Sequence, residues 1–248
     1  MNKRLTRHEM TQKDEFISKV EMAVGWVEKN WRNVAMAVAG TAAFVLLAVV
    51  LVSIISARGR AADVMLGESM SLMAATILPP GQLPPLTGES TFGSTGERNE
   101  AVLAGLEELL ATYPSSKAAV DSAFLRGTTL LRMGRVEEAK TALVDFVQEH
   151  ATSHLLPAAR RALAAANLES GSNEEGLAIL HDLADNPSLL FPADAALMEL
   201  ARGQETSGRL DEAQESYRRL AIEHPQSIYA GDAAQAVARL SNPANASS

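Results

Sequence analysis

Cysteine is absent from this chain of 248 residues, and aromatic residues make up only 4% of it. The absence of cysteine excludes disulfide bonds, thiolate metal ligands, thiol catalysis and a lipid anchor on cysteine. Few large aromatic side chains, with alanine and leucine dominant, favour helices that pack closely. No segment has the pattern of a β-sheet, so we expect an all-α protein.

Basic residues are scarce in the C-terminal part of the chain. Residues 99–248 contain 12 Lys/Arg and 21 Asp/Glu, a net charge of −9. Binding to nucleic acid requires clustered Lys/Arg that neutralise phosphates, so we expect no nucleic-acid partner. An acidic surface instead suits basic or apolar segments of partner proteins.

A short phrase recurs at a fixed period in this acidic part. The strings GRVEEA, GSNEEG and GRLDEA begin at Gly134, Gly171 and Gly208, 37 residues apart each time. Glycine ends a helix in the left-handed conformation, acids favour the first turn of the next helix, and a small residue follows where two helices meet. Each phrase therefore predicts the elbow of a helical hairpin, and the period predicts stacked hairpins.

This pattern resembles the tetratricopeptide repeat. With Ala139 at the family's small position in the second helix, Gly127 falls on the small position of the first, and Pro225 on the closing proline of the last repeat. The period of 37 residues exceeds the usual value of about 34, Gly176 replaces an alanine, and the family's tryptophan is absent. The resemblance implies a helical-hairpin solenoid over residues 99–240.

The concave surface of such a solenoid, lined by the first helix of each hairpin, is where partners bind. The resemblance implies that this lining binds a peptide or a partner's helix, while packing between repeats is the alternative for several positions. The family's inward-facing positions are Phe124, Thr128 and Leu131 in one repeat, Arg161, Ala165 and Leu168 in the next, and Met198, Arg202 and Glu205 in the third.

A long apolar run precedes the repeats. No charged residue interrupts the run from Asn33 to Ala57, and about 22 helical residues span roughly 33 Å, enough for a bilayer core. We expect a transmembrane helix at residues 34–57, uncleaved because the run and its leader are too long for a signal peptide. The residues expected at the membrane interfaces are Trp26, Trp31, Arg58 and Arg60.

The charge distribution predicts how this helix is oriented. Seven Lys/Arg precede the run in residues 1–33, which favours a cytoplasmic N-terminus. The layout resembles the bacterial tetratricopeptide proteins that include the ancillary subunit of the Sec translocon. The endings YPSSKAA and HPQSIYAGDAA are similar to those of the cell-division-coordinator kind. The resemblance implies a single-pass protein of the bacterial inner membrane with periplasmic repeats.

The segments around the anchor have their own patterns. Residues 1–33 form an amphipathic leader, which fits either a helix on the cytoplasmic membrane face or one docked on a membrane partner. Residues 58–78 are expected to be a juxtamembrane helix whose methionines bind apolar segments or pack on the repeats or the membrane surface. Residues 79–98 are expected to be a Pro/Gly/Ser linker, and residues 241–248 a disordered tail.

The sequence contains no catalytic constellation. His150 and His154 are four residues apart and could hold a metal, but they lie near a helix end without a third ligand, which favours solvated turn histidines. Acidic pairs such as Glu137 and Glu138 stand where helix starts favour them. We therefore expect no enzyme, no metal and no cofactor.

Two functions fit these features. The first is a membrane-anchored, periplasm-facing interaction module that assists translocation, folding or assembly of envelope proteins through transient contacts with clients or with the Sec translocon. The second is a stoichiometric accessory subunit or assembly scaffold of one membrane complex.

Overall fold

The computed structural model describes residues 20–78 and 90–241, and the chain divides into two compact units, Met1–Ala57 and Arg58–Ser248. Apart from one pair of two-residue strands, the regular elements in these ranges are helices, as expected. In the first unit, residues 20–29 are helical and Asn30 forms a turn. Helix α2 (Trp31–Met73) then begins, and it runs into the second unit. The expected disordered tail lies almost entirely outside the described residues.

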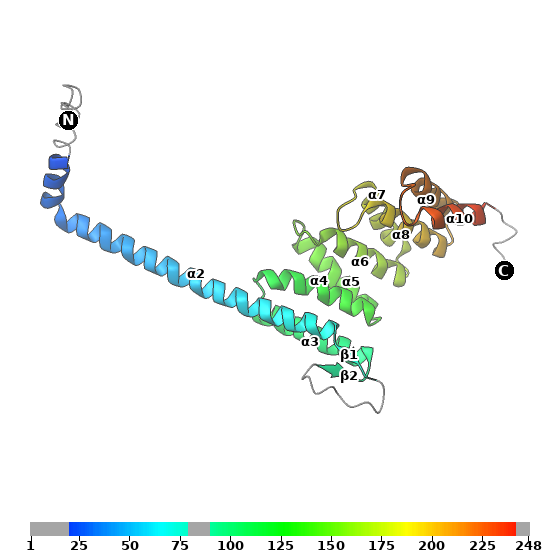
Figure 1. Cartoon of the computed structure of the whole chain (residues 1–248), viewed down its shortest axis with the longest axis horizontal. Helices are drawn as coiled ribbons and strands as arrows, with labels where there is room; N and C mark the ends of the chain where they lie inside the picture. The colour runs from blue at the N-terminus through cyan, green and yellow to red at the C-terminus, as the bar shows by residue number, and fades with distance from the viewer. Residues whose placement is uncertain (1–19, 79–89, 242–248) are drawn as a thin grey trace, which may run out of the picture. The chain divides into compact units, whose positions relative to one another are not determined.

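The last turns of α2 pack against α3 (Thr95–Thr112) in the second unit (Figure 1). Ala62 of α2 is fully buried in one cluster with Leu109 of α3. Gly105 of α3 allows a close approach, because a Cβ built there would lie 2.6 Å from the hydroxyl of Ser69 on α2. The end of α2 and α3 therefore form one more packed pair ahead of the repeats.

The observed end of α2 and start of α3 differ from the predicted boundaries. The juxtamembrane helix ends at Met73 rather than residue 78, and Thr76–Ile77 (β1) pair in parallel with Thr91–Phe92 (β2), where no strand was predicted. Helix α3 begins at Thr95, inside the predicted linker. The cause is a capping box: Ser94 accepts from the backbone N–H of Glu97, and the Glu97 carboxylate accepts from that of Gly93.

The other helices alternate as the first and second members of hairpins, which follow one another from α3 to α10 in Figure 1. The hairpins are α4 (Lys117–Arg132) with α5 (Val136–Glu149), α6 (Leu156–Glu169) with α7 (Asn173–Asp185), and α8 (Ala193–Thr206) with α9 (Leu210–Glu223), followed by α10 (Ala230–Leu240).

The three predicted elbows have the expected backbone. Gly134, Gly171 and Gly208 have φ of 73°, 81° and 78°, the left-handed region that favours glycine. The residue after each glycine donates its N–H back to a carbonyl of the preceding helix, as Arg135 does to Leu130 at 3.0 Å. These bonds satisfy carbonyl groups that the helix end leaves free.

Small residues set the spacing inside the hairpins. A Cβ at Gly127 would lie 2.8 Å from Leu143, and one at Gly176 would lie 3.0 Å from the carbonyl oxygen of Ala164. The helices therefore meet closely where the sequence has these glycines. The largest buried cluster extends from α6 to α10. Helix α8, the first helix of its hairpin, lies in the middle of this cluster.

Candidate functional site: a groove along helix α8

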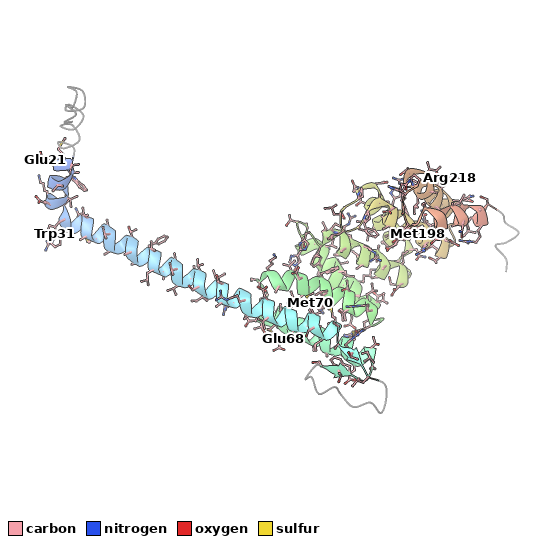
Figure 2. All side chains as sticks on the ribbon, in the orientation of Figure 1. Glu21, Trp31, Glu68, Met70, Met198 and Arg218 are labelled. Carbon is pink, nitrogen blue, oxygen red and sulfur yellow. The ribbon has the colours of Figure 1, made fainter. Side chains whose placement is uncertain are left out.

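One stripe of α8 lines two neighbouring cavities. Ala195 and Glu199 line a cavity of about 580 Å³, and Met198 and Arg202 line one of about 470 Å³. Positions i, i+3, i+4 and i+7 share one face of a helix, so these cavities follow a single line. Figure 2 labels Met198 among the C-terminal helices. We use the name α8 groove for this stripe together with its borders. The borders lie on α6, on α10 and on two loops, residues 186–192 and 224–229.

The first cavity joins an aromatic floor to an ion pair. Phe191 is buried, and the guanidinium of Arg161 on α6 lies 5.5 Å from the centre of its ring. The same guanidinium contacts the Glu199 carboxylate of α8 at 2.6 Å. Because the Arg161 side chain stays 54% exposed, its charge remains open to a ligand in the cavity.

Apolar side chains at the rim of this cavity are exposed to solvent. Leu189 is fully exposed, and Leu190 and Ile228 are 54% and 86% exposed. Leu190 and Ile228 both line the cavity, although they come from two loops, residues 186–192 and 224–229. Exposed apolar side chains gathered at a concave site, with polar groups beside them, are typical of protein-binding surfaces.

Both loops are held by local hydrogen bonds. Ser188 and Phe191 exchange two bonds, each 3.1 Å long, from backbone N–H to carbonyl and from backbone N–H to hydroxyl. The Ser227 hydroxyl donates to the Asp194 carboxylate at 2.6 Å, and this bond is the main cause that lowers the pKa of Asp194. The loops thus present their apolar side chains without collapsing onto the core.

A second ion pair borders the other cavity. Arg239 of α10 contacts both carboxylate oxygens of Glu205, at 2.6 and 3.1 Å, and the Tyr217 hydroxyl donates to the same carboxylate at 3.1 Å. The pair with Arg239 lowers the pKa of Glu205. The pKa of Tyr217 is raised to about 12, mainly by burial of the hydroxyl and secondly by its hydrogen bond to Glu205. Glu205 is therefore ionised and Tyr217 protonated at neutral pH.

The structure brings together part of the predicted concave lining. Arg161, Met198 and Arg202 line the groove, and Glu205 lies beside it in the pair with Arg239. Met198 forms the floor, since it is only 3% exposed. Arg202 is exposed at the rim.

The other predicted positions lie in packing between helices. Phe124 is half-buried with its ring centroid 5.9 Å from that of Phe146, and Leu131 packs against two buried clusters. Leu168 fills the space beside Gly176 and Gly203. Thr128 donates its hydroxyl to a backbone carbonyl of its own helix, and Ala165 is half-buried.

The sequence pattern missed the apolar rim. Leu190 and Ile228 of the rim, and Phe191 of the floor, lie between helices, where the repeat register assigns no inward or outward face. The available signal was the composition of the two loops: consecutive large apolar residues stand beside Pro and Ser, where a surface turn would ordinarily be polar.

The two histidines that were weighed as a metal pair do not share one helix face. His150 caps the C-terminus of α5, and its ring centroid lies 5.0 Å from that of Phe146. The helix ends there, so His154 does not share its face. Across residues 20–78 and 90–241, no group of three or more metal-ligating side chains comes together.

Helix α2 is, among the described residues, the one helix long and apolar enough to cross a membrane, and an apolar window of 18 residues within it has a mean hydropathy of 2.8. None of its apolar window is buried inside the protein. The residues predicted for the membrane interfaces, Trp26, Trp31, Arg58 and Arg60, are all exposed.

Comparison with known proteins agrees with the fold. Residues 195–227, which cover most of α8 and all of α9, match the tetratricopeptide repeat family. A repeat of this kind indicates a protein–protein interaction module. None of the curated proteins matches the sequence.

Solved structures share the hairpin solenoid at low sequence identity. The chain is similar to a Podosopora anserina kinesin light chain with nearly identical TPR-like repeats, at 18% identity and a TM-score of 0.51, over 58% of this chain and 77% of that one. A form of the same protein with one substitution gives 19% identity and a TM-score of 0.50 over the same shares. The crystal structure of MamA is 19% identical over 59% of this chain and 82% of its own, with a TM-score of 0.47.

These likenesses define the class of protein. The fold is a tetratricopeptide-like helical-hairpin solenoid preceded by one long apolar helix. Repeats of this fold indicate a module that binds other proteins.

Proposed function

We propose that α2 anchors this protein in the bacterial inner membrane and that its periplasmic repeats bind segments of envelope proteins during translocation, folding or assembly. The observation that carries this proposal is the α8 groove. Its apolar rim is exposed and held in place, and it opens directly onto a cavity of about 580 Å³.

The chemistry of the groove defines a class of partner segment. Leu190, Ile228 and the Phe191 floor suit one large apolar side chain. Arg161, Glu199 and Asp194 give the same cavity one positive and two negative charges, within a domain that is acidic overall. A segment with an apolar residue flanked by Lys or Arg is therefore complementary to it.

Photo-crosslinking in living cells tests the groove directly. A photoreactive phenylalanine analogue would replace Leu190 or Ile228 in the groove. A matched position is Ile222 on α9, which is 70% exposed and lines none of the groove cavities. We expect crosslinks to many envelope proteins from Leu190 and Ile228, and few from Ile222.

The pattern of crosslinks distinguishes the two functions. Many substoichiometric partners, with or without translocon subunits, support transient binding to clients. One complex recovered at constant stoichiometry would instead make the protein an accessory subunit or scaffold. Equal yields from the groove positions and from Ile222 would refute the α8 groove as the binding site.

The absence of cysteine makes the orientation easy to measure. Ala151 lies exposed in the turn between α5 and α6, so Ala151→Cys gives the chain a single thiol in the repeat domain. A membrane-impermeant maleimide applied to intact cells with a permeabilised outer membrane should label this variant. Labelling that requires lysis of the inner membrane would place the repeats in the cytoplasm.

A further inference from the structure

The helix before α2 separates its apolar and polar side chains completely within the described residues. At 100° per residue, one side of residues 20–29 carries only apolar side chains, and the opposite side carries Glu21, Gly25, Glu28 and Lys29. The apolar side consists of Val20, Met22, Ala23, Val24, Trp26 and Val27.

Among the described residues of its own unit, none covers this apolar side. Its five large side chains are between 43% and 68% exposed. A helix with one wide apolar face and one charged face is stable when the apolar face leaves water. The face therefore requires a surface other than the described residues of the first unit.

Asn30 joins this helix to α2 without leaving its own backbone groups unpaired. Its N–H donates to the Trp26 carbonyl at 3.0 Å, its carbonyl accepts from the N–H of Val34 at 3.0 Å, and its side-chain amide donates to the Trp26 carbonyl at 2.9 Å. One helix thus ends and the next begins at a single polar residue, and Figure 2 shows the chain changing direction at the labelled Trp31, which follows it.

We propose that residues 20–29 lie in the plane of the membrane surface, with this apolar face in the lipid headgroup and acyl boundary. The argument is continuity: the charge-free run of α2 starts at Asn33, three residues after the joint, so an inserted α2 brings the preceding helix to the lipid surface. The inference rests on the proposed membrane anchoring.

The charges of the helix define how it binds. Its described polar side carries two acids and one base, so it gains no attraction from anionic lipids. Burial of the apolar face supplies the binding. We therefore expect this helix to insert already in neutral phosphatidylcholine vesicles, without phosphatidylglycerol.

Trp26 and Trp31 are the two tryptophans of the chain, which makes their fluorescence a specific probe. Full-length Trp31→Phe protein, with Trp26 as its sole tryptophan, would be reconstituted into vesicles whose lipids carry bromine near the top of the acyl chains. We expect emission at short wavelength, a loss of about twofold in intensity from the bromolipid, and little quenching by aqueous iodide.

Neighbouring positions supply a matched control. In a Trp26→Phe/Trp31→Phe background, Val27→Trp places the probe on the apolar side and Glu28→Trp on the polar side. The first should behave like Trp26, and the second should be quenched by iodide and not by bromolipid. Both variants keep the helix length and differ by one residue in position.

Each remaining outcome overturns a defined part of the proposal. If Trp26 is as accessible to iodide as the Glu28→Trp probe, the helix stands in water. If Trp26 is shielded from both quenchers, a protein segment covers it. In both cases a bromolipid-quenched Trp31, measured in Trp26→Phe protein, shows that the anchor still holds. If neither tryptophan is quenched and the protein does not float with the vesicles, the anchoring itself fails.

Discussion

The contact between α2 and α3 leads to a quantitative prediction about Gly105. A Cβ added there would lie 2.6 Å from Ser69 Oγ, shorter than the 3.0 Å that real Cβ contacts respect, but 3.6 Å from Ser69 Cβ. Ser69 is 2% exposed, and its hydroxyl donates to the Met65 carbonyl at 3.0 Å. The hydroxyl therefore cannot move aside into water.

Two opposing effects decide the magnitude. Replacing glycine by alanine inside a helix stabilises it by about 1 kcal/mol, while overpacking at a close contact costs about 1–3 kcal/mol. Gly105→Ala alone should thus lower the free energy of unfolding by up to about 2 kcal/mol. With Ser69→Ala, the nearest atom is the Cβ at 3.6 Å, so the same substitution should instead stabilise by about 1 kcal/mol.

The pair forms a double-mutant cycle with an expected coupling of about 1–3 kcal/mol. Amide hydrogen exchange of α3 peptides, measured on the full-length protein in detergent, reports the local stability of α3 in each variant. A local measurement is needed because a solenoid need not unfold as one unit. Gly67→Ala on α2 is the control, since nothing lies within 4 Å of its Cβ. If Gly105→Ala protects α3 equally with and without Ser69→Ala, then α2 and α3 are not packed as described.

Three further substitutions test other parts of the repeat domain. Gly171→Ala forces alanine to a φ of 81°, which should cost about 1 kcal/mol and lower the melting temperature by about 2–4 °C. Arg239→Gln removes the main cause that lowers the pKa of Glu205. The ionised Glu205 stabilises the fold at a pH above the pKa that it has in the unfolded chain, and this contribution is lost as the pH falls through its lower pKa in the folded protein. The variant should therefore lose less stability than wild type on acidification towards about pH 3. Phe191→Ala empties the floor beneath Arg161 and should cost about 3 kcal/mol in urea unfolding, whereas Ile228→Ala should cost almost nothing.

The stacked hairpins were predictable because their signals are local. A glycine at a left-handed position, followed by acids at the start of a helix, is determined by a few neighbouring residues. The structure confirms this at Gly134, Gly171 and Gly208. The structure also explains why glycine stands at position 176, because the carbonyl of Ala164 and the side chain of Leu168 approach too closely for the family's alanine.

The contact of α2 with α3 was not predictable in the same way. It depends on residues far apart in the chain, with Ser69 against Gly105 and Ala62 beside Leu109, and no repeat register connects them. The one local sign was the capping box formed by Ser94 and Glu97, which the surrounding Pro, Gly, Ser and Thr obscured. Composition therefore predicted a linker where a helix begins.

The α8 groove contains residues that the repeat register predicts and residues that it does not. The register of the repeat assigns Arg161, Met198 and Arg202 to one surface, because inward positions recur with the helices, and all three line cavities of the groove. Leu190 and Ile228 come from loops outside that register. A solenoid keeps its helices regular for stacking, so its loops are free to vary. If the proposed binding is correct, exchanging these two rim residues for polar ones should change which partners bind while leaving the fold and the helix-borne charges intact.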